Sequence, residues 1–301
     1  MNSTYLESVD KWFGWKGFLT LIALSLFCIL VIGISIGALQ LILTGLSATG
    51  SAEEDSSFYI WNGIAMLAVL VVPVAIGLIW LLRKDSFAFT HYPIRFNRKT
   101  RTVHVLRTDG TVLSVPWDEV FFTLGHMPQW DDWEVRGHVL KSDRKTVQET
   151  FALSYVGSME LNDRDPKVAD SSANDFVRAH WEFVRRYMEE GPQSVSEQVQ
   201  FCMPVQNHRE SFRGGLERAF ANISGAPSLI YIAMFPFLVL LGLARFIAMR
   251  TSKIPEWPAD VEASCVIEPN DPYAIHGAPN GDRMPLFPEA AKCAGVGFKA
   301  F

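Results

Sequence analysis

Histidine and cysteine build many protein metal sites, so their spacing is the first clue to the chemistry of this sequence. The histidines stand at positions 91, 104, 126, 138, 180, 208 and 276. No two are four residues apart, as on a metal-binding helix face, and none belongs to a Cys/His cluster. The sequence therefore predicts no metal site, and we interpret His104 and His138 as hydrogen-bonded histidines of a sheet.

A second candidate is the run Trp130-Asp131-Asp132-Trp133-Glu134, in which two tryptophans bracket two of three acids. Paired carboxylates perform acid–base catalysis when burial separates their pKa values, but nothing nearby indicates burial. Tryptophans beside acids are more typical of an anchored loop or a protein contact, so Trp130 and Trp133 are predicted partner-contact residues. The sequence also lacks a G-x-S-x-G elbow and glycine loops for phosphate or dinucleotides. We therefore expect a protein that is not an enzyme and uses no cofactor.

The four cysteines show no C-x-x-C spacing, and two of them, Cys265 and Cys293, stand in the C-terminal tail. These two could form one disulfide if the tail faces an oxidising compartment. Two unpaired thiols are the alternative.

The elements that must position these residues are dominated by apolar blocks. Of the 301 residues, 49% are hydrophobic and only 20% are charged, which is more apolar than an ordinary soluble protein. The net charge of -5 argues against nucleic acid as a partner. Membrane lipid is the expected surrounding.

Two blocks, residues 17–46 and 59–82, contain no charged residue. Each is longer than the ~20 residues that cross a bilayer core, so residues 1–85 are predicted to form a transmembrane hairpin. A cleaved signal peptide is the alternative for the first block, but such peptides have a shorter apolar region. Gly33 and Gly37 form a G-x-x-x-G pair, which predicts close packing with the second span, a foreign helix or a second copy.

The distribution of basic residues predicts the orientation. The connector between the two blocks has three acids and no base, whereas basic residues precede the first block and follow the second. Because cytoplasmic flanks retain Lys and Arg, residues 84–225 are predicted to lie in the cytoplasm, beside a bacterial inner membrane. Arg95, Arg98, Lys99 and Arg101 form a membrane-proximal basic cluster, which serves as a topology determinant or as a lipid head-group site.

A third apolar block, residues 226–249, precedes a Pro-rich tail over residues 250–301. Its length favours a third transmembrane segment, which would place the tail outside. Pro236 divides the block and its flanking charges are balanced, so a re-entrant hairpin with a cytoplasmic tail is the alternative.

Residues 86–200 are predicted to form a cytosolic sheet domain, because their apolar residues alternate with the period of half-buried strands. We expect strands over residues 94–96, 102–107, 111–116, 120–124, 133–140 and 146–153. Asp109-Gly110 predicts a tight turn, and successive hairpins predict an antiparallel meander. An amphipathic helix follows over residues 172–190. Another lies within residues 201–225, and its basic and apolar faces suit either an anionic leaflet or packing against the protein.

An antiparallel sheet closed by a C-terminal helix resembles the pleckstrin-homology-like (PH-like) architecture. In addition, Pro93-Ile94-Arg95-Phe96-Asn97-Arg98 and Pro116-Trp117-Asp118, placed between the apolar blocks, resemble a group of uncharacterised bacterial inner-membrane proteins. Proteins of that group are often encoded beside type VI secretion toxins. The resemblance implies an α+β membrane protein that acts as an immunity or accessory protein for a membrane-acting toxin. A membrane-anchored sensor or assembly scaffold, which binds lipid head groups or a cytosolic protein, is the alternative.

Overall fold

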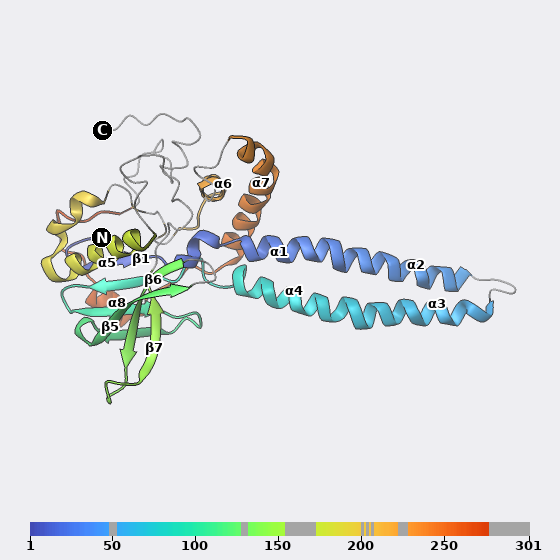
Figure 1. Ribbon diagram of the computed structural model, residues 1–301, viewed down its shortest axis with the longest axis horizontal. Coiled ribbons are helices and arrows are strands. Elements are labelled where there is room, and N and C mark those ends of the chain that lie inside the picture. The colour runs from blue at the N-terminus through green and yellow to red at the C-terminus, as the bar shows by residue number, and fades with distance from the viewer. Residues whose placement is uncertain are drawn as a thin grey trace.

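The computed structural model describes residues 1–47, 53–127, 132–153, 173–199, 202, 205, 208–221 and 228–276. The fold combines helices with antiparallel sheets, and a long helical hairpin projects from a body that contains the sheets (Figure 1). Three helices are long and apolar enough to cross a membrane, which is consistent with a membrane protein. The mixed α and β composition predicted from the sequence is therefore confirmed.

The two arms of the hairpin are nearly continuous helices. The first arm consists of α1 (Phe18–Leu26), a π-helical turn (Phe27–Ile32) and α2 (Gly33–Ser47). The second consists of α3 (Glu53–Met66), a π-helical turn (Leu67–Val71) and α4 (Val72–Asp85). Pro73 is the second residue after the second π-helical turn. Since proline lacks an N–H and crowds the carbonyl one turn earlier, the wider turn accommodates it without ending the helix.

The arms approach most closely at glycines other than the predicted pair. A Cβ on Gly45 would lie 2.7 Å from the Ser56 carbonyl oxygen, and one on Gly63 would lie 2.8 Å from the Ala38 carbonyl oxygen. In contrast, a Cβ on Gly33 would meet nothing within 4 Å, and one on Gly37 would meet only Met66, at 3.6 Å. Gly33 therefore does not pack the two arms together, and its side of α2 is open.

The body contains two antiparallel sheets. The first has the strand order β1 (Tyr5–Ser8), β2 (Ile94–Asn97), β3 (Thr102–Leu106) and β4 (Val112–Pro116). The second has the order β5 (Val120–Met127), β6 (Asp132–Leu140) and β7 (Val147–Ala152). All six predicted strands are present. β1 was not predicted, because it is a short segment far in the sequence from the strand with which it pairs.

The pairing of β1 with β2 sets the place of the hairpin. Ser8 lies opposite Ile94 and Tyr5 opposite Asn97 in antiparallel register. The whole helical hairpin is thus inserted into the connection between two neighbouring strands. Both of its ends are held by one sheet.

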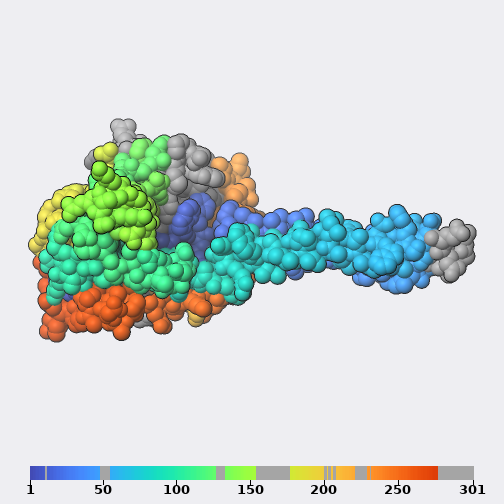
Figure 2. Space-filling view, turned by 90° about the horizontal axis from the view of Figure 1, so that it is seen from below, coloured from blue at the N-terminus to red at the C-terminus, as the bar shows by residue number. Residues whose placement is uncertain are grey.

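The remaining helices pack on the second sheet, at the foot of the hairpin and in the tail. α5 (Ala173–Glu190) packs against β6, and its Trp181 stacks on Trp117 with ring centroids 5.7 Å apart. α6 (Phe212–Ala221) packs along α7 (Ser228–Thr251), which remains one helix through Pro236. α8 (Ala259–Ser264) lies in the C-terminal tail, which runs back along the body. In Figure 2 the orange and red atoms of this part of the chain line one side of the body.

Candidate functional site: a buried polar junction

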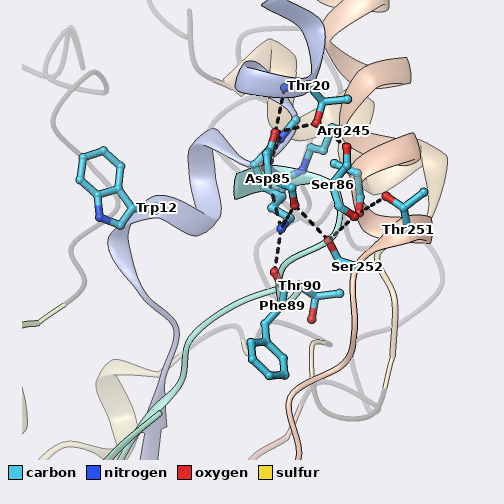
Figure 3. A network of polar contacts seen from close by, with 12 residues as sticks. Trp12, Thr20, Asp85, Ser86, Phe89, Thr90, Arg245, Thr251 and Ser252 are labelled. Carbon is cyan, nitrogen blue, oxygen red and sulfur yellow. Dashed lines mark hydrogen bonds and ion pairs between the residues drawn. The ribbon is translucent and has the colours of Figure 1, made fainter. Parts of the chain in front are cut away.

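The largest group of buried polar residues lies where the hairpin enters the body (Figure 3). Asp85, the last residue of α4, is 6% exposed and accepts hydrogen bonds from the backbone N–H groups of Gly17 and Thr20, each at 3.0 Å. Those groups belong to the first turn of α1, whose N–H groups have no partner within the helix. Asp85 therefore caps the N-terminus of the neighbouring helix, where the helix dipole favours a negative charge.

Lys16 makes the reciprocal cap. Its Nζ donates to the carbonyl oxygens of Asp85 and Phe89, both at 2.6 Å, at the C-terminal end of α4. The same ammonium lies 3.8 Å from the Asp85 carboxylate. Each helix end is thus satisfied by a charged side chain from the other arm, with the sign that each dipole favours.

Arg245 ties α7 to this junction, although it is only 1% exposed. Nε and Nη2 donate to the two carboxylate oxygens of Glu210, at 2.6 and 2.7 Å. Nη1 donates to the carbonyl oxygens of Phe13 and Lys16, at 2.8 and 3.0 Å, just before α1. A bidentate pair with further hydrogen bonds is the arrangement that compensates for burying a guanidinium.

Close backbone packing completes the junction. Gly17 has a φ of +94°, and a Cβ there would lie 2.3 Å from the Arg245 Cα. Only glycine fits, because both the conformation and the space exclude a side chain. The Ser252 hydroxyl donates to the carbonyl oxygens of Asp85 and Ser86, so the end of α7 is bonded to the end of α4.

The carboxylates and cations of the junction bind helix ends, one another and backbone carbonyl oxygens. Among the described residues, no three His, Cys, Asp or Glu side chains are grouped so that they could hold a metal ion. The arrangement can hold three helices and the sheet in one fixed geometry.

A second buried cation joins the tail to the sheet. Arg95 on β2 is 2% exposed and donates to Glu7 on β1 at 2.8 Å. Its guanidinium lies between the rings of Tyr5 and Trp257, with the carbon 4.4 and 4.8 Å from the two centroids. Glu262 of α8 lies 3.2 Å from Nη1. Beside it is a cleft of about 140 Å³ whose lining includes these charged groups and His91.

Three of the four residues of the membrane-proximal basic cluster are paired with acids. Arg95 is buried with Glu7, Lys99 pairs with Glu268, and Arg101 pairs with both Asp118 and Glu189. The turn after β2 that carries Arg98, Lys99 and Arg101 lies at the far end of that strand, because its near end, at Ile94, follows the hairpin. The four residues therefore do not form an open basic face next to the hairpin.

The other predicted site residues are separated. Trp133 is half-buried and stacks on His126, with ring centroids 4.2 Å apart, while Trp130 lies outside the described residues. Cys265 is a buried free thiol beside Asn97, and Cys293 also lies outside the described residues. Glu134, one of the suspected paired acids, accepts a hydrogen bond from Arg136 at 2.6 Å.

Sequence reasoning did not find the junction, although two signals were present. Asp85 stands at the C-terminal end of an apolar block, where its charge opposes the dipole of its own helix, so it needed a partner elsewhere. Arg245 interrupts the third block near its end. The sequence does not reveal that these residues meet, because 160 residues separate them.

The fold and this site define a class of protein: a mixed α/β body attached through a polar junction to a long apolar hairpin. A family of unknown function, DUF6708, matches residues 70–269, about two-thirds of the chain, and the chain belongs to that family. No curated protein and no solved structure matches it.

Proposed function

We propose that this protein is a non-enzymatic membrane anchor and interaction protein, and that its partner is a membrane-acting toxin against which it serves as an immunity or accessory protein. The proposal rests on what the charged residues of the buried polar junction bind. Its charged groups hold the hairpin to the sheet domain. A rigid joint of this kind suits a protein that presents a surface at the membrane.

The hairpin supports the membrane part of the proposal. Its exposed side chains are large and apolar along both arms, among them Ile29, Ile36, Val69 and Ile76, each more than 60% exposed. Such a surface is stable in lipid and costly in water. In the orientation predicted from the basic residues, the body lies in the cytoplasm of a bacterial cell.

The partner surface we propose is the open side of α2 at Gly33. Helices that meet in lipid do so at small residues, where backbones approach closely, and a Cβ placed on Gly33 would have no neighbour within 4 Å. The arms already pack on each other through Gly45 and Gly63. The open glycine is therefore available to a helix of the toxin.

The test is protection of cells that express a membrane-acting type VI secretion toxin from the same bacterium. We expect growth with the wild-type protein and killing with Gly33→Leu, because the new side chain fills the open side without touching the second arm. Gly77→Leu is the matched control, since a Cβ on Gly77 would also meet nothing within 4 Å, and it should protect. Equal killing with and without the wild-type protein would reject the immunity role.

The alternative, a PH-like domain that senses lipid head groups, has less support. A head-group site needs cations that are free to meet a phosphate, whereas Lys99 and Arg101 are paired with acids. A sheet of four strands, a sheet of three strands and the packed helix α5 support the PH-like architecture itself. Retention of the purified protein on anionic vesicles that is unchanged in Lys99→Glu would count against head-group binding.

A further inference from the structure

The third apolar helix has a different environment from the hairpin. Near its C-terminal end, Ala244, Ala248 and Met249 are buried in the body. Before that end most of the large side chains are exposed: Leu229, Ile230, Ile232, Phe235, Phe237, Leu240 and Leu243 are between 40% and 77% exposed, whereas Leu238 is buried. No charged residue occurs between Ser228 and Ala244. The C-terminal end of α7 thus belongs to the body, and the preceding part presents an apolar surface.

Both ends of the α6–α7 unit are fixed at the same place. Before α6, Glu210 binds Arg245, and Arg209 donates to the Ser252 carbonyl oxygen at 3.2 Å. The helices then run antiparallel, since Gly215 lies beside Arg245 and Phe220 contacts Phe235. The chain therefore leaves the junction along α6 and returns to it along α7.

The segment after α7 is part of the same folded body as the first sheet. Lys253 exchanges backbone hydrogen bonds with Ala88 and Thr90, at 2.9 and 2.8 Å. Further along, Asn97 donates to the Ser264 carbonyl oxygen, and the Met1 N-terminus donates to the Ile275 carbonyl oxygen. Residues 252–276 must then lie on the same side of a membrane as β1 and β2.

A single crossing by α7 is incompatible with this geometry, because it would separate the tail from the sheet to which it is bonded. α6 has 10 residues and is about 15 Å long at ~1.5 Å per residue, so it is too short to supply a second crossing of a core ~30 Å thick. Figure 1 also shows α7 running across the foot of the hairpin and not alongside it.

We infer that α6 and α7 form a helical hairpin that inserts into the leaflet on the side of the sheet domain and does not cross the bilayer. Its apolar part lies among the acyl chains of that leaflet, next to the hairpin that crosses. Two tryptophans precede α1 and are exposed: Trp12 by 63% and Trp15 by 41%. Exposed tryptophans are typical of the head-group region of a membrane. The Arg250 guanidinium, which lies over the Phe246 ring near the end of α7, is also suited to that region. The inference uses the membrane anchoring of the proposed function and is independent of the toxin.

The first test compares two reporter positions in the full chain. Alkaline phosphatase, active only after export, and green fluorescent protein, fluorescent only in the cytoplasm, are placed in the 48–52 connector and after residue 301. We expect phosphatase activity at the connector and fluorescence at the C-terminus. Phosphatase activity at both positions would overturn the inference and leave the anchor intact. If the phosphatase in the connector were inactive, the connector would lie in the cytoplasm, and both the membrane anchor and this inference would be rejected.

The second test measures depth in vesicles of phosphatidylethanolamine and phosphatidylglycerol. Nitroxide labels are attached to Ile232→Cys, Ile32→Cys and Arg213→Cys in a chain whose four native cysteines are replaced. Relaxation by oxygen relative to a water-soluble nickel complex should be several-fold higher at position 232 than at position 213, and highest at position 32. A label at position 232 that matches either of the other two would contradict insertion into one leaflet.

Discussion

At the residue scale, Asp85 has the most demanding environment in the junction. It caps α1 while facing Lys16, and both are buried. In Asp85→Asn an acceptor for the N–H groups is kept but the charge opposite Lys16 is lost. We expect the free energy of unfolding to decrease by about 1–3 kcal/mol, because the buried Lys16 ammonium loses the negative charge that partly compensates for its burial.

The measurement is the apparent melting temperature in a mild detergent. Asp118→Asn is the control, since that carboxylate is exposed and its pair with Arg101 is screened by solvent. An equal decrease in both variants would contradict the capping role.

His91 predicts a pH dependence. It is 5% exposed, with Nδ1 3.0 Å from the Thr90 hydroxyl, and burial together with the nearby Lys16 ammonium lowers its pKa from 6.5 to about 4. Because the folded state binds the proton less readily than the unfolded state, this stabilising contribution is complete above about pH 6.5 and is lost as the pH falls toward 4.

In that window the free energy of unfolding should decrease by up to about 1.4 kcal/mol per pH unit on account of this group. His91→Gln should flatten the dependence of the melting temperature on pH. His180 contributes in the same direction, since burial also lowers its pKa to about 4, so the slope should decrease without vanishing. An unchanged slope would show that His91 is protonated in the folded state.

At the element scale, the hairpin depends on glycines that let its arms touch. In Gly63→Leu the new Cβ would lie 2.6 Å from Ile42 Cγ1 and 2.8 Å from the Ala38 carbonyl oxygen. The arms must move apart, which loses packing along α2 and α3. We expect a lower melting temperature and a longer distance between spin labels placed on the two arms.

Gly77→Leu provides the comparison, because the same side chain there enters open space. It should leave both readings unchanged. If the two variants behaved alike, the close packing of the arms at Gly63 would not explain the effect.

The same scale explains why the hairpin can be long and still rigidly placed. β1 and β2 are neighbours in one sheet, and the connection between them contains the complete hairpin. Reciprocal caps by Asp85 and Lys16 then fix the direction in which the arms leave the sheet. The orientation of the hairpin is therefore set by bonds at its base.

At the scale of the whole molecule, the tail closes the body. Arg95 binds Glu7 and Glu262 and lies between two aromatic rings, so it joins the N-terminal strand, the first sheet and α8. In Arg95→Leu the partly exposed Glu7 and the half-exposed Glu262 lose their cation, and the contacts of the guanidinium with the two rings are lost.

We therefore expect trypsin to cleave after Lys253 at least about tenfold faster in Arg95→Leu, because local opening of the tail becomes more frequent. Lys99→Leu is the control, since Lys99 pairs with Glu268 at the surface. A similar cleavage rate in wild type and Arg95→Leu would mean that other contacts hold the tail.

Much of the architecture follows from local patterns. Uncharged blocks longer than a bilayer core require helices, and period-two alternation with Asp109-Gly110 between two segments requires a hairpin of strands. These features depend on neighbours in sequence, so the six strands, α5 and the three apolar helices could be predicted.

Only the tertiary structure decided what these elements do together. The role of the four residues of β1, the meeting of Asp85 with Lys16 and Arg245, the neutralisation of the basic cluster, and the choice of Gly45 and Gly63 over Gly33 all depend on contacts between distant residues. Hydropathy shows that α7 is apolar, but a helix crosses a membrane or returns according to where its two ends are bonded. Those bonds form only in the folded chain.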